Sequence, residues 1–156
     1  MERRFSMKSE NETRTTILFE ELEDISLGHK SYQNFLNERK VEKTFTSLRD
    51  FINSYLSQHP DITPSVIIKN SNLSKNYVYP ICNGTKNPSK YKLTAFCIGA
   101  HMNLKETQKA LSLAGCSALH PKIPADAGII VCINTKYKSV ADVNLFLDKN
   151  GVESPF

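Results

Sequence analysis

The sequence lacks any long apolar run. Its hydrophobic stretches are only a few residues long, whereas a helix needs roughly 20 apolar residues to cross a bilayer, so we expect no membrane span. The N-terminal residues are polar and charged, with no apolar segment behind them, which argues against a signal peptide and for a cytoplasmic protein. A chain of 156 residues can bury a core, so we expect one domain or a small domain with helical extensions.

Clusters of metal-binding or catalytic side chains are also missing. The 4 cysteines form no CxxC pair and the 4 histidines show no HxxxH spacing, so the sequence predicts no metal and no cofactor. Isolated cysteines of this kind are typical of core thiols in a reducing compartment. Paired carboxylates, a nucleophile with its base and a glycine-rich phosphate loop do not stand out either, so we do not expect an enzyme.

Acidic residues are absent from one long stretch. From Ile62 to Lys105 the chain has six lysines and no Asp or Glu. Nine basic and eleven acidic residues precede this stretch and five of each follow it, so it holds all of the net charge of +4. We expect a polyanion to be attracted there, with binding that weakens as salt rises. A solvated lysine-rich surface is the alternative, and the complete absence of acids makes it less favoured.

Within the acid-free stretch, residues 63–89 predict two helices joined by a tight turn. Thr63 can N-cap the first helix, and a proline follows at the first helical position, where its missing N–H has no consequence. Asn72 stands where the chain must reverse, and asparagine tolerates the left-handed conformation. Leu73 is expected to be buried in the turn, and Ser74 is a good N-cap for the second helix.

The second helix is predicted over residues 74–83. Val78 and Ile81 lie three residues apart and give it one buried face, and Gly84 is expected to end it. Pro80 falls inside this helix, where a proline removes one backbone hydrogen bond and clashes with the carbonyl four residues earlier. Two readings follow from that proline: the helix begins late, or it is kinked.

This segment resembles the Cro/C1-type (XRE-like) helix-turn-helix regulators. The usual pieces in that family are a polar cap, a Gly or Asn turn, a Ser or Thr cap, an aromatic–aliphatic pair and a Gly–basic–x–x–Pro–Ser loop. They stand here as Thr63, Asn72, Ser74, Tyr77 with Val78, and the run from Gly84 to Ser89. The resemblance covers residues 45–115. It implies a lambda-repressor-like five-helix domain, double-stranded DNA as the partner and a homodimer.

Hydrophobic periodicity elsewhere predicts more helices, and therefore an all-α fold. Three domains are expected: an N-terminal helical extension (1–44, disordered at its start), the helix-turn-helix domain (45–115) and a C-terminal helical hairpin (116–156). The run GIIVCI in the hairpin also fits a buried strand, but no second strand is there to pair with it, so helix is favoured. The further predicted helices span 15–24, 31–43, 47–57, 89–101, 103–114, 125–135 and 139–150.

The resemblance also assigns roles to side chains on and around the second helix. In this fold that helix enters the major groove with its N-terminus first, so its early exposed residues meet base edges. The base-reading candidates are Lys75, Asn76 and Tyr79. Lysine can donate to guanine and asparagine can pair with adenine. The phosphate-binding candidates are Thr63, Lys69, Ser74, Lys86, Asn87 and Lys90.

Two functions therefore remain open. The first is a sequence-specific DNA-binding transcriptional regulator that acts as a dimer. The alternative is a protein-interaction adaptor or antitoxin-like module built on the same fold, binding its protein partner through the helical flanks. Those long flanks and the proline in the second helix suit the alternative.

Overall fold

The fold is all-α, as predicted: the part of the chain that the structure describes contains helices and no strand. A computed structural model gives the structure of the protein. Contacts divide the chain into two compact units, Met1–Thr44 and Phe45–Phe156. The described residues are 19–29, 31–34, 45, 47–135 and 137–156.

The N-terminal unit contains helix at residues 19–26 and again at 32–34. Gly28 lies between them with φ +79°, a left-handed conformation that glycine adopts without strain, so it separates the two helices as expected. The remaining residues of the predicted N-terminal helices, and the stretch expected to be disordered, fall in 1–18 and 35–44, outside the described residues.

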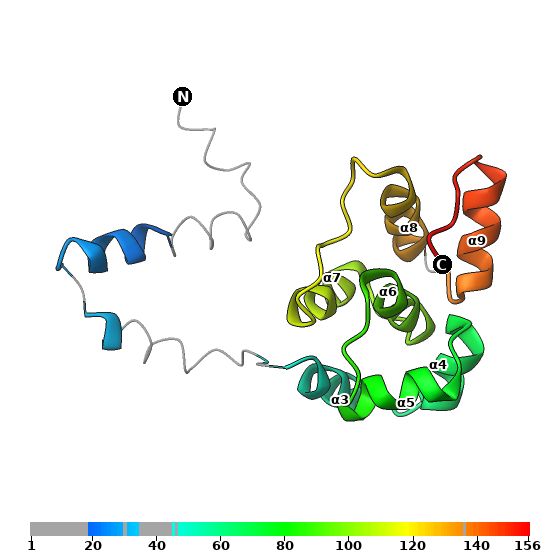
Figure 1. Ribbon diagram of the computed structural model, residues 1–156, viewed down its shortest axis with the longest axis horizontal. Coiled ribbons are helices and arrows are strands. Elements are labelled where there is room, and N and C mark those ends of the chain that lie inside the picture. Colours follow the sequence, from blue (N-terminus) through cyan, green and yellow to red (C-terminus); the bar gives the residue numbers. More distant parts are fainter. Residues whose placement is uncertain (1–18, 30, 35–44, 46, 136) are drawn as a thin grey trace. The chain divides into compact units, whose positions relative to one another are not determined.

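Within the described residues of the second unit, the chain forms seven helices, whose arrangement is drawn in Figure 1. Their bounds lie close to those predicted, except that α6 ends at Gly99, because His101 takes a left-handed φ of 59°. The helices are α3 (Leu48–Gln58), α4 (Pro64–Ser71), α5 (Lys75–Asn83), α6 (Lys90–Gly99), α7 (Leu104–Leu113), α8 (Pro124–Asn134) and α9 (Val140–Lys149).

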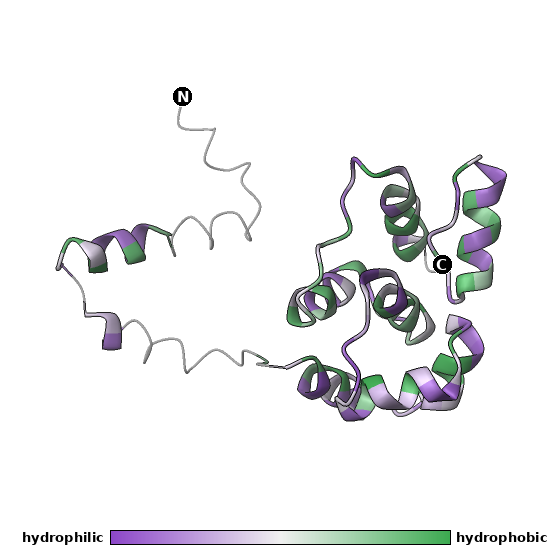
Figure 2. Cartoon of the chain, in the orientation of Figure 1, coloured by the Kyte–Doolittle hydropathy of each residue, from purple (hydrophilic) through white to green (hydrophobic). Residues whose placement is uncertain are grey.

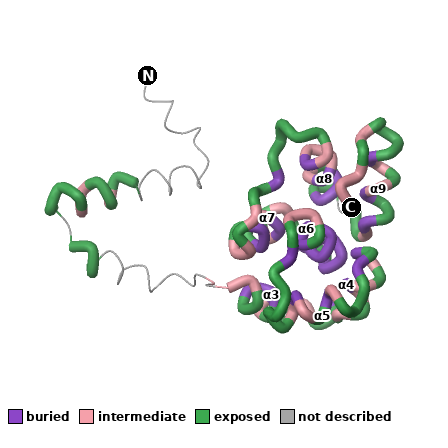
Figure 3. The backbone as a smooth tube through the Cα atoms, viewed as in Figure 1, coloured by how far each residue is buried: buried purple, intermediate pink, exposed green. Residues whose placement is uncertain are grey.

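Helix α6 is the central element of this unit. Every residue from 93 to 99 is buried, and Figure 3 shows α6 buried between its neighbours. A helix that is apolar on all sides must be enclosed by other elements. Gly99 brings α6 close to α4, since a Cβ there would lie 2.9 Å from the Ile67 carbonyl oxygen. This close approach fixes α4, and with it the turn that follows α4.

The C-terminal hairpin packs on the same unit. The run GIIVCI is part of α8, which Figure 2 shows as largely hydrophobic, so the helical interpretation is confirmed over the strand. Ile129 of α8 and Leu147 of α9 are fully buried. Beyond α9 the chain folds back, and the ring of Phe156 meets the ring of Tyr91 edge-on, with centroids 6.4 Å apart. The hairpin is therefore anchored to α6.

Candidate nucleic-acid interface

The turn between α4 and α5 has the predicted construction. The Thr63 hydroxyl caps α4 by accepting the Val66 N–H at 3.3 Å. Asn72 ends α4 with φ 58°, the left-handed conformation that asparagine tolerates. Leu73 is buried, and its N–H donates to the Ser71 hydroxyl at 3.2 Å. The turn is thus held by a buried leucine and by short-range hydrogen bonds.

Helix α5 follows with one buried face and one exposed face. Val78 and Ile81 are fully buried, as predicted from their spacing. Lys75, Asn76 and Tyr79 are exposed. The three exposed residues occupy the first and second turns of α5, and positions four apart on a helix lie on the same side. A lysine, an amide and a phenol therefore share one open surface, which we call the α5 face.

Pro80 is accommodated without interrupting α5. The helix begins at Lys75 and continues through Pro80 to Asn83, so the reading in which it begins late is wrong. Because proline has no N–H, the carbonyl of Asn76 lacks its helical donor. Asn76 is exposed, so water can satisfy that oxygen.

The carbonyl end of α5 organises the loop that follows. Gly84 ends the helix with φ 80°, and its N–H donates to the Ile81 carbonyl at 3.3 Å. The N–H groups of Thr85 and Lys86 both donate to the Pro80 carbonyl, at 3.0 and 3.2 Å. Bonds of this kind satisfy carbonyls that a helix end leaves open. They also turn the chain so that Lys86 returns over α5.

Two lysines converge on one aromatic ring beside the α5 face. The Lys86 ammonium lies 3.9 Å from the centre of the Tyr77 ring, and the Lys92 ammonium lies 5.8 Å from it. Tyr77 is half-buried, and both lysines are exposed. A cation over an aromatic face is attracted by the ring quadrupole. The ring therefore restrains positive charge at the surface without neutralising it. We call these three residues the Tyr77 cluster.

Lys90, one of the predicted phosphate-binding residues, pairs with a carboxylate of the protein itself. Its ammonium donates to Asp126 at 2.8 Å, and its side chain is only 16% exposed. The Asp126 carboxylate is fully buried and also accepts the Tyr91 hydroxyl at 2.8 Å and the His120 N–H at 2.9 Å. A lysine held in this way would have to leave Asp126 before it could contact a phosphate.

The same contacts set the ionisation of Asp126. Burial alone would raise its pKa, but the hydrogen bonds from Lys90, His120 and Tyr91, together with the Lys90 charge, outweigh burial and lower the pKa below its usual value. The carboxylate is therefore kept charged. It joins α8 to the start of α6, and we call these four residues the Asp126 cluster.

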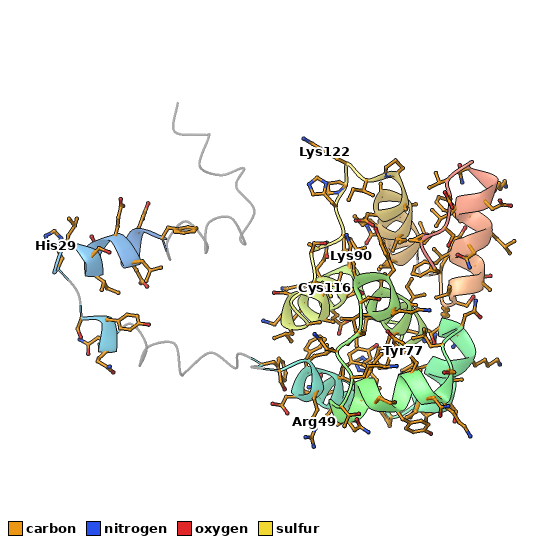
Figure 4. The ribbon with its side chains drawn as sticks, viewed as in Figure 1. His29, Arg49, Tyr77, Lys90, Cys116 and Lys122 are labelled. Carbon is orange, nitrogen blue, oxygen red and sulfur yellow. The ribbon has the colours of Figure 1, made fainter. Side chains whose placement is uncertain are left out.

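One cation near α5 could not have been picked out from the sequence. A Cβ built on Gly84 would lie 3.0 Å from Cδ of Arg49, so the Arg49 side chain of α3 runs against the end of α5. Figure 4 shows Arg49 on this side of the unit and Lys122 at the opposite end. Arg49 lies outside the acid-free stretch and is followed by Asp50, so no local pattern distinguishes it.

The other phosphate candidates are exposed but more dispersed. Thr63, Lys69, Ser74 and Asn87 all reach solvent. Ser74 has the extended backbone of an N-cap, yet its hydroxyl oxygen accepts no helix N–H, so the whole hydroxyl is open to a ligand. In the described residues, no hydrogen bond or ion pair joins these four side chains to those of the α5 face. The structure thus places them on the surface without assembling them into one cluster.

The remaining reactive side chains are built into the core. All four cysteines are free, and Cys97 and Cys132 are fully buried. Burial raises the pKa of Cys132 to about 11 and that of Cys97 further still. Among the described residues no three His, Cys, Asp or Glu side chains are grouped as metal ligands, and no helix is long and apolar enough to cross a membrane.

Comparison with known proteins adds no assignment. No protein-family model matches the chain, and neither a curated protein nor a solved structure matches it. The geometry alone marks a candidate site, an exposed helix face with hydrogen-bond donors that is bordered by restrained cations. Such a surface can bind an extended anion through its cations and can offer hydrogen-bond donors to polar groups of the same molecule.

Proposed function

We propose that this chain is a sequence-specific, double-stranded DNA-binding transcriptional regulator of the Cro/C1 helix-turn-helix type. In this proposal α3 to α7 form a lambda-repressor-like five-helix domain, and α5 enters the major groove. The protein acts as a homodimer, without a cofactor and without catalysis. The order of the helices, the left-handed residue at Asn72 and the exposed start of α5 support this proposal.

The observation that carries the proposal is the composition of the α5 face. Lys75 and Asn76 occupy the first two positions of the helix, where a recognition helix meets base edges. Lysine donates to guanine O6 and N7, and an asparagine amide can both donate to and accept from adenine. Tyr79, which is 49% exposed, extends the same surface with a hydroxyl and an apolar ring.

Positive charge around this face suits the phosphate backbone. The Tyr77 cluster holds two ammonium groups beside α5, and Arg49 adds a guanidinium at its far end. Ser74 and Thr63 offer hydroxyl donors at the starts of α5 and α4. Contacts of this kind fix the register of a protein on DNA and give affinity that falls with salt, but they carry no sequence information.

The direct test is selection of bound fragments from a random duplex library at physiological salt. We expect enrichment of a palindrome whose half-sites lie about one helical turn apart, roughly 34 Å, because a two-fold dimer presents two α5 helices. Enrichment of one unpaired half-site would support DNA reading by a single copy. A library that emerges unenriched would overturn the proposal.

A matched pair of double variants then tests the assignment of the α5 face. Lys75→Ala with Asn76→Ala should abolish preference for the selected sequence while leaving weak, salt-sensitive binding to random duplex. The control is Lys122→Ala with Asn134→Ala, which removes the same two side-chain types from exposed positions near α8. Equal affinity of both double variants for the selected sequence would show that α5 does not read it.

The protein-interaction alternative is favoured by one observation in the N-terminal unit. Phe19, on the helix at residues 19–26, is 69% exposed, and Leu27, in the turn that follows this helix, is 67% exposed. Both could be buried by a protein partner. If library selection enriches nothing, and Phe19→Ser with Leu27→Ser releases a co-purifying protein, the adaptor or antitoxin-like function replaces the DNA-binding one.

A further inference from the structure

Helix α9 carries an unusual surface on its outer side. Leu145 is 69% exposed, although leucine is among the residues most often buried. It lines an open hollow of about 700 Å³ along the helix. Figure 3 shows α9 at the edge of the second unit with much of its surface exposed. The residues that line the hollow are Tyr137, Asp142, Leu145, Phe146, Lys149 and Asn150.

The order of these residues along α9 is self-complementary. Asp142 and Lys149 lie seven residues apart, which is about two helical turns, so they fall on the same side of the helix. Leu145 and Phe146 stand midway between them. Along α9 the stripe therefore runs from an acidic residue, through two apolar residues, to a basic residue. We call these four residues the α9 stripe.

We propose that the α9 stripe is the interface between two copies of this chain, packed antiparallel about a two-fold axis. In that arrangement the axis passes near Leu145 and Phe146, and Asp142 of each copy faces Lys149 of the other. A two-fold interface must use the same patch twice, so it requires a patch that complements itself. Parallel packing would instead set Asp142 against Asp142 and Lys149 against Lys149.

Two further features favour the antiparallel pairing. Asp142 lies in the first turn of α9 and Lys149 in the last, so each charge already suits its own helix dipole, and two antiparallel helices align opposite ends. The apolar centre is also preformed, because the Phe146 ring meets the Tyr137 ring edge-on with centroids 5.9 Å apart. Little side-chain ordering then remains for association.

This inference deepens the proposed function, which needs two copies, but its test contains no DNA and so can fail separately. The full-length chain is examined by sedimentation equilibrium over a range of concentrations. We expect a dimer for the wild type. Leu145→Glu should raise the dimer dissociation constant at least about tenfold, since a leucine that the dimer would bury is replaced by a charge. At protein concentrations below the wild-type dimer dissociation constant, thermal unfolding of the variant should match the wild type, because Leu145 is exposed in the single chain and dimer formation then adds no stability.

Charge reversal gives a readout that misfolding cannot imitate. Asp142→Lys leaves a stripe with two positive charges and Lys149→Asp leaves one with two negative charges, so each variant alone should dimerise more weakly. An equimolar mixture should recover a heterodimer, because every facing pair is again opposite in sign. Asp148→Lys is the matched control: it makes the same charge change on an exposed α9 residue outside the stripe.

Three results would overturn the interface. They are a monomeric wild type at every concentration, a dimer that Leu145→Glu leaves intact, and a mixture of the two reversal variants that stays monomeric. The first would also be the outcome if the stripe instead bound a different protein. A chain that selects a DNA sequence but sediments as a monomer would remove the α9 interface and leave the DNA-binding proposal standing.

Discussion

The Tyr77 cluster and the Asp126 cluster use lysine in opposite ways. Lys86 lies on an aromatic ring and keeps its ammonium at the surface, whereas Lys90 is drawn inward to a buried carboxylate. The two lysines are four residues apart in the same acid-free stretch. Not every lysine in an acid-free stretch is therefore available to a ligand, because an acidic residue distant in sequence can form an ion pair with one of them.

The difference also separates what the two clusters can do. An exposed cation over a half-buried ring remains available to a polyanion, and the strength of its interaction with that polyanion depends on salt. A buried ion pair with hydrogen bonds to all its partners is shielded from salt and instead holds two elements together. The first cluster belongs to the proposed interface, and the second fixes the hairpin that carries the α9 stripe.

The largest predicted effect on stability is that of Asp126→Ala, which removes the carboxylate at the centre of the Asp126 cluster. Removing the carboxylate leaves the Lys90 ammonium and the Tyr91 hydroxyl without their shared partner in a largely buried site, which we expect to lower the free energy of unfolding by about 3–5 kcal/mol. Urea unfolding measures the change. Asp148→Ala, at an exposed position on α9, is the control and should stay within about 0.5 kcal/mol of the wild type.

Lowering the pH should remove the stability that the charged Asp126 carboxylate contributes. Because the pKa of Asp126 is lowered in the folded protein, its charged form contributes stability that is complete above the ordinary aspartate pKa of about 3.9. That contribution is lost as pH falls through the lowered value. The stability difference between the wild type and Asp126→Asn should thus be constant near neutral pH and shrink below about pH 4. A difference that grew with acid would contradict the assigned ionisation.

A smaller effect should distinguish packing beneath the turn from packing in the hairpin. Gly99→Ala would place a Cβ 2.9 Å from the Ile67 carbonyl oxygen, which is backbone and cannot move aside. Gly128→Ala would meet the tip of the Leu147 side chain, which can rotate. We expect Gly99→Ala to cost about 1–3 kcal/mol and Gly128→Ala less, as measured by thermal unfolding. Equal costs would mean that the approach of α6 to α4 is not tightly fixed.

The sequence predicted the local features of the fold well. These features are the left-handed turn at Asn72, the helix end at Gly84, the cap at Thr63 and the buried pair Val78 and Ile81. Each depends on residues within one or two helical turns of each other. Such features follow from backbone conformation and helical periodicity, so they can be inferred without the tertiary structure. The helical interpretation of GIIVCI also held, because no partner strand was available.

Contacts between distant segments could not be predicted in the same way. Asp126 forms an ion pair with Lys90 although it lies 36 positions further along the chain, and no sequence pattern predicts a contact between them. Arg49 reaches Gly84 from α3, again across many residues. Nor did the pattern show that α5 would continue through Pro80, or that the Pro80 carbonyl would accept hydrogen bonds from the N–H groups of the loop. The base-reading and phosphate-binding roles themselves remain predictions, which the variants described here address.

The smallest predicted effect compares the two lysines directly. Lys86→Ala removes a surface cation and should reduce the slope of log affinity against log salt by about 1 for duplex DNA, while costing at most about 1 kcal/mol of stability. Lys90→Met should do the reverse: it strands the buried Asp126 charge and lowers stability, yet leaves the salt slope of the folded protein unchanged. Fluorescence titrations at several salt concentrations, run where both variants are folded, measure the slopes. If Lys90→Met reduced the slope as much as Lys86→Ala does, Lys90 would have to leave Asp126 on binding DNA, and the division between a surface cluster and a structural cluster would fail.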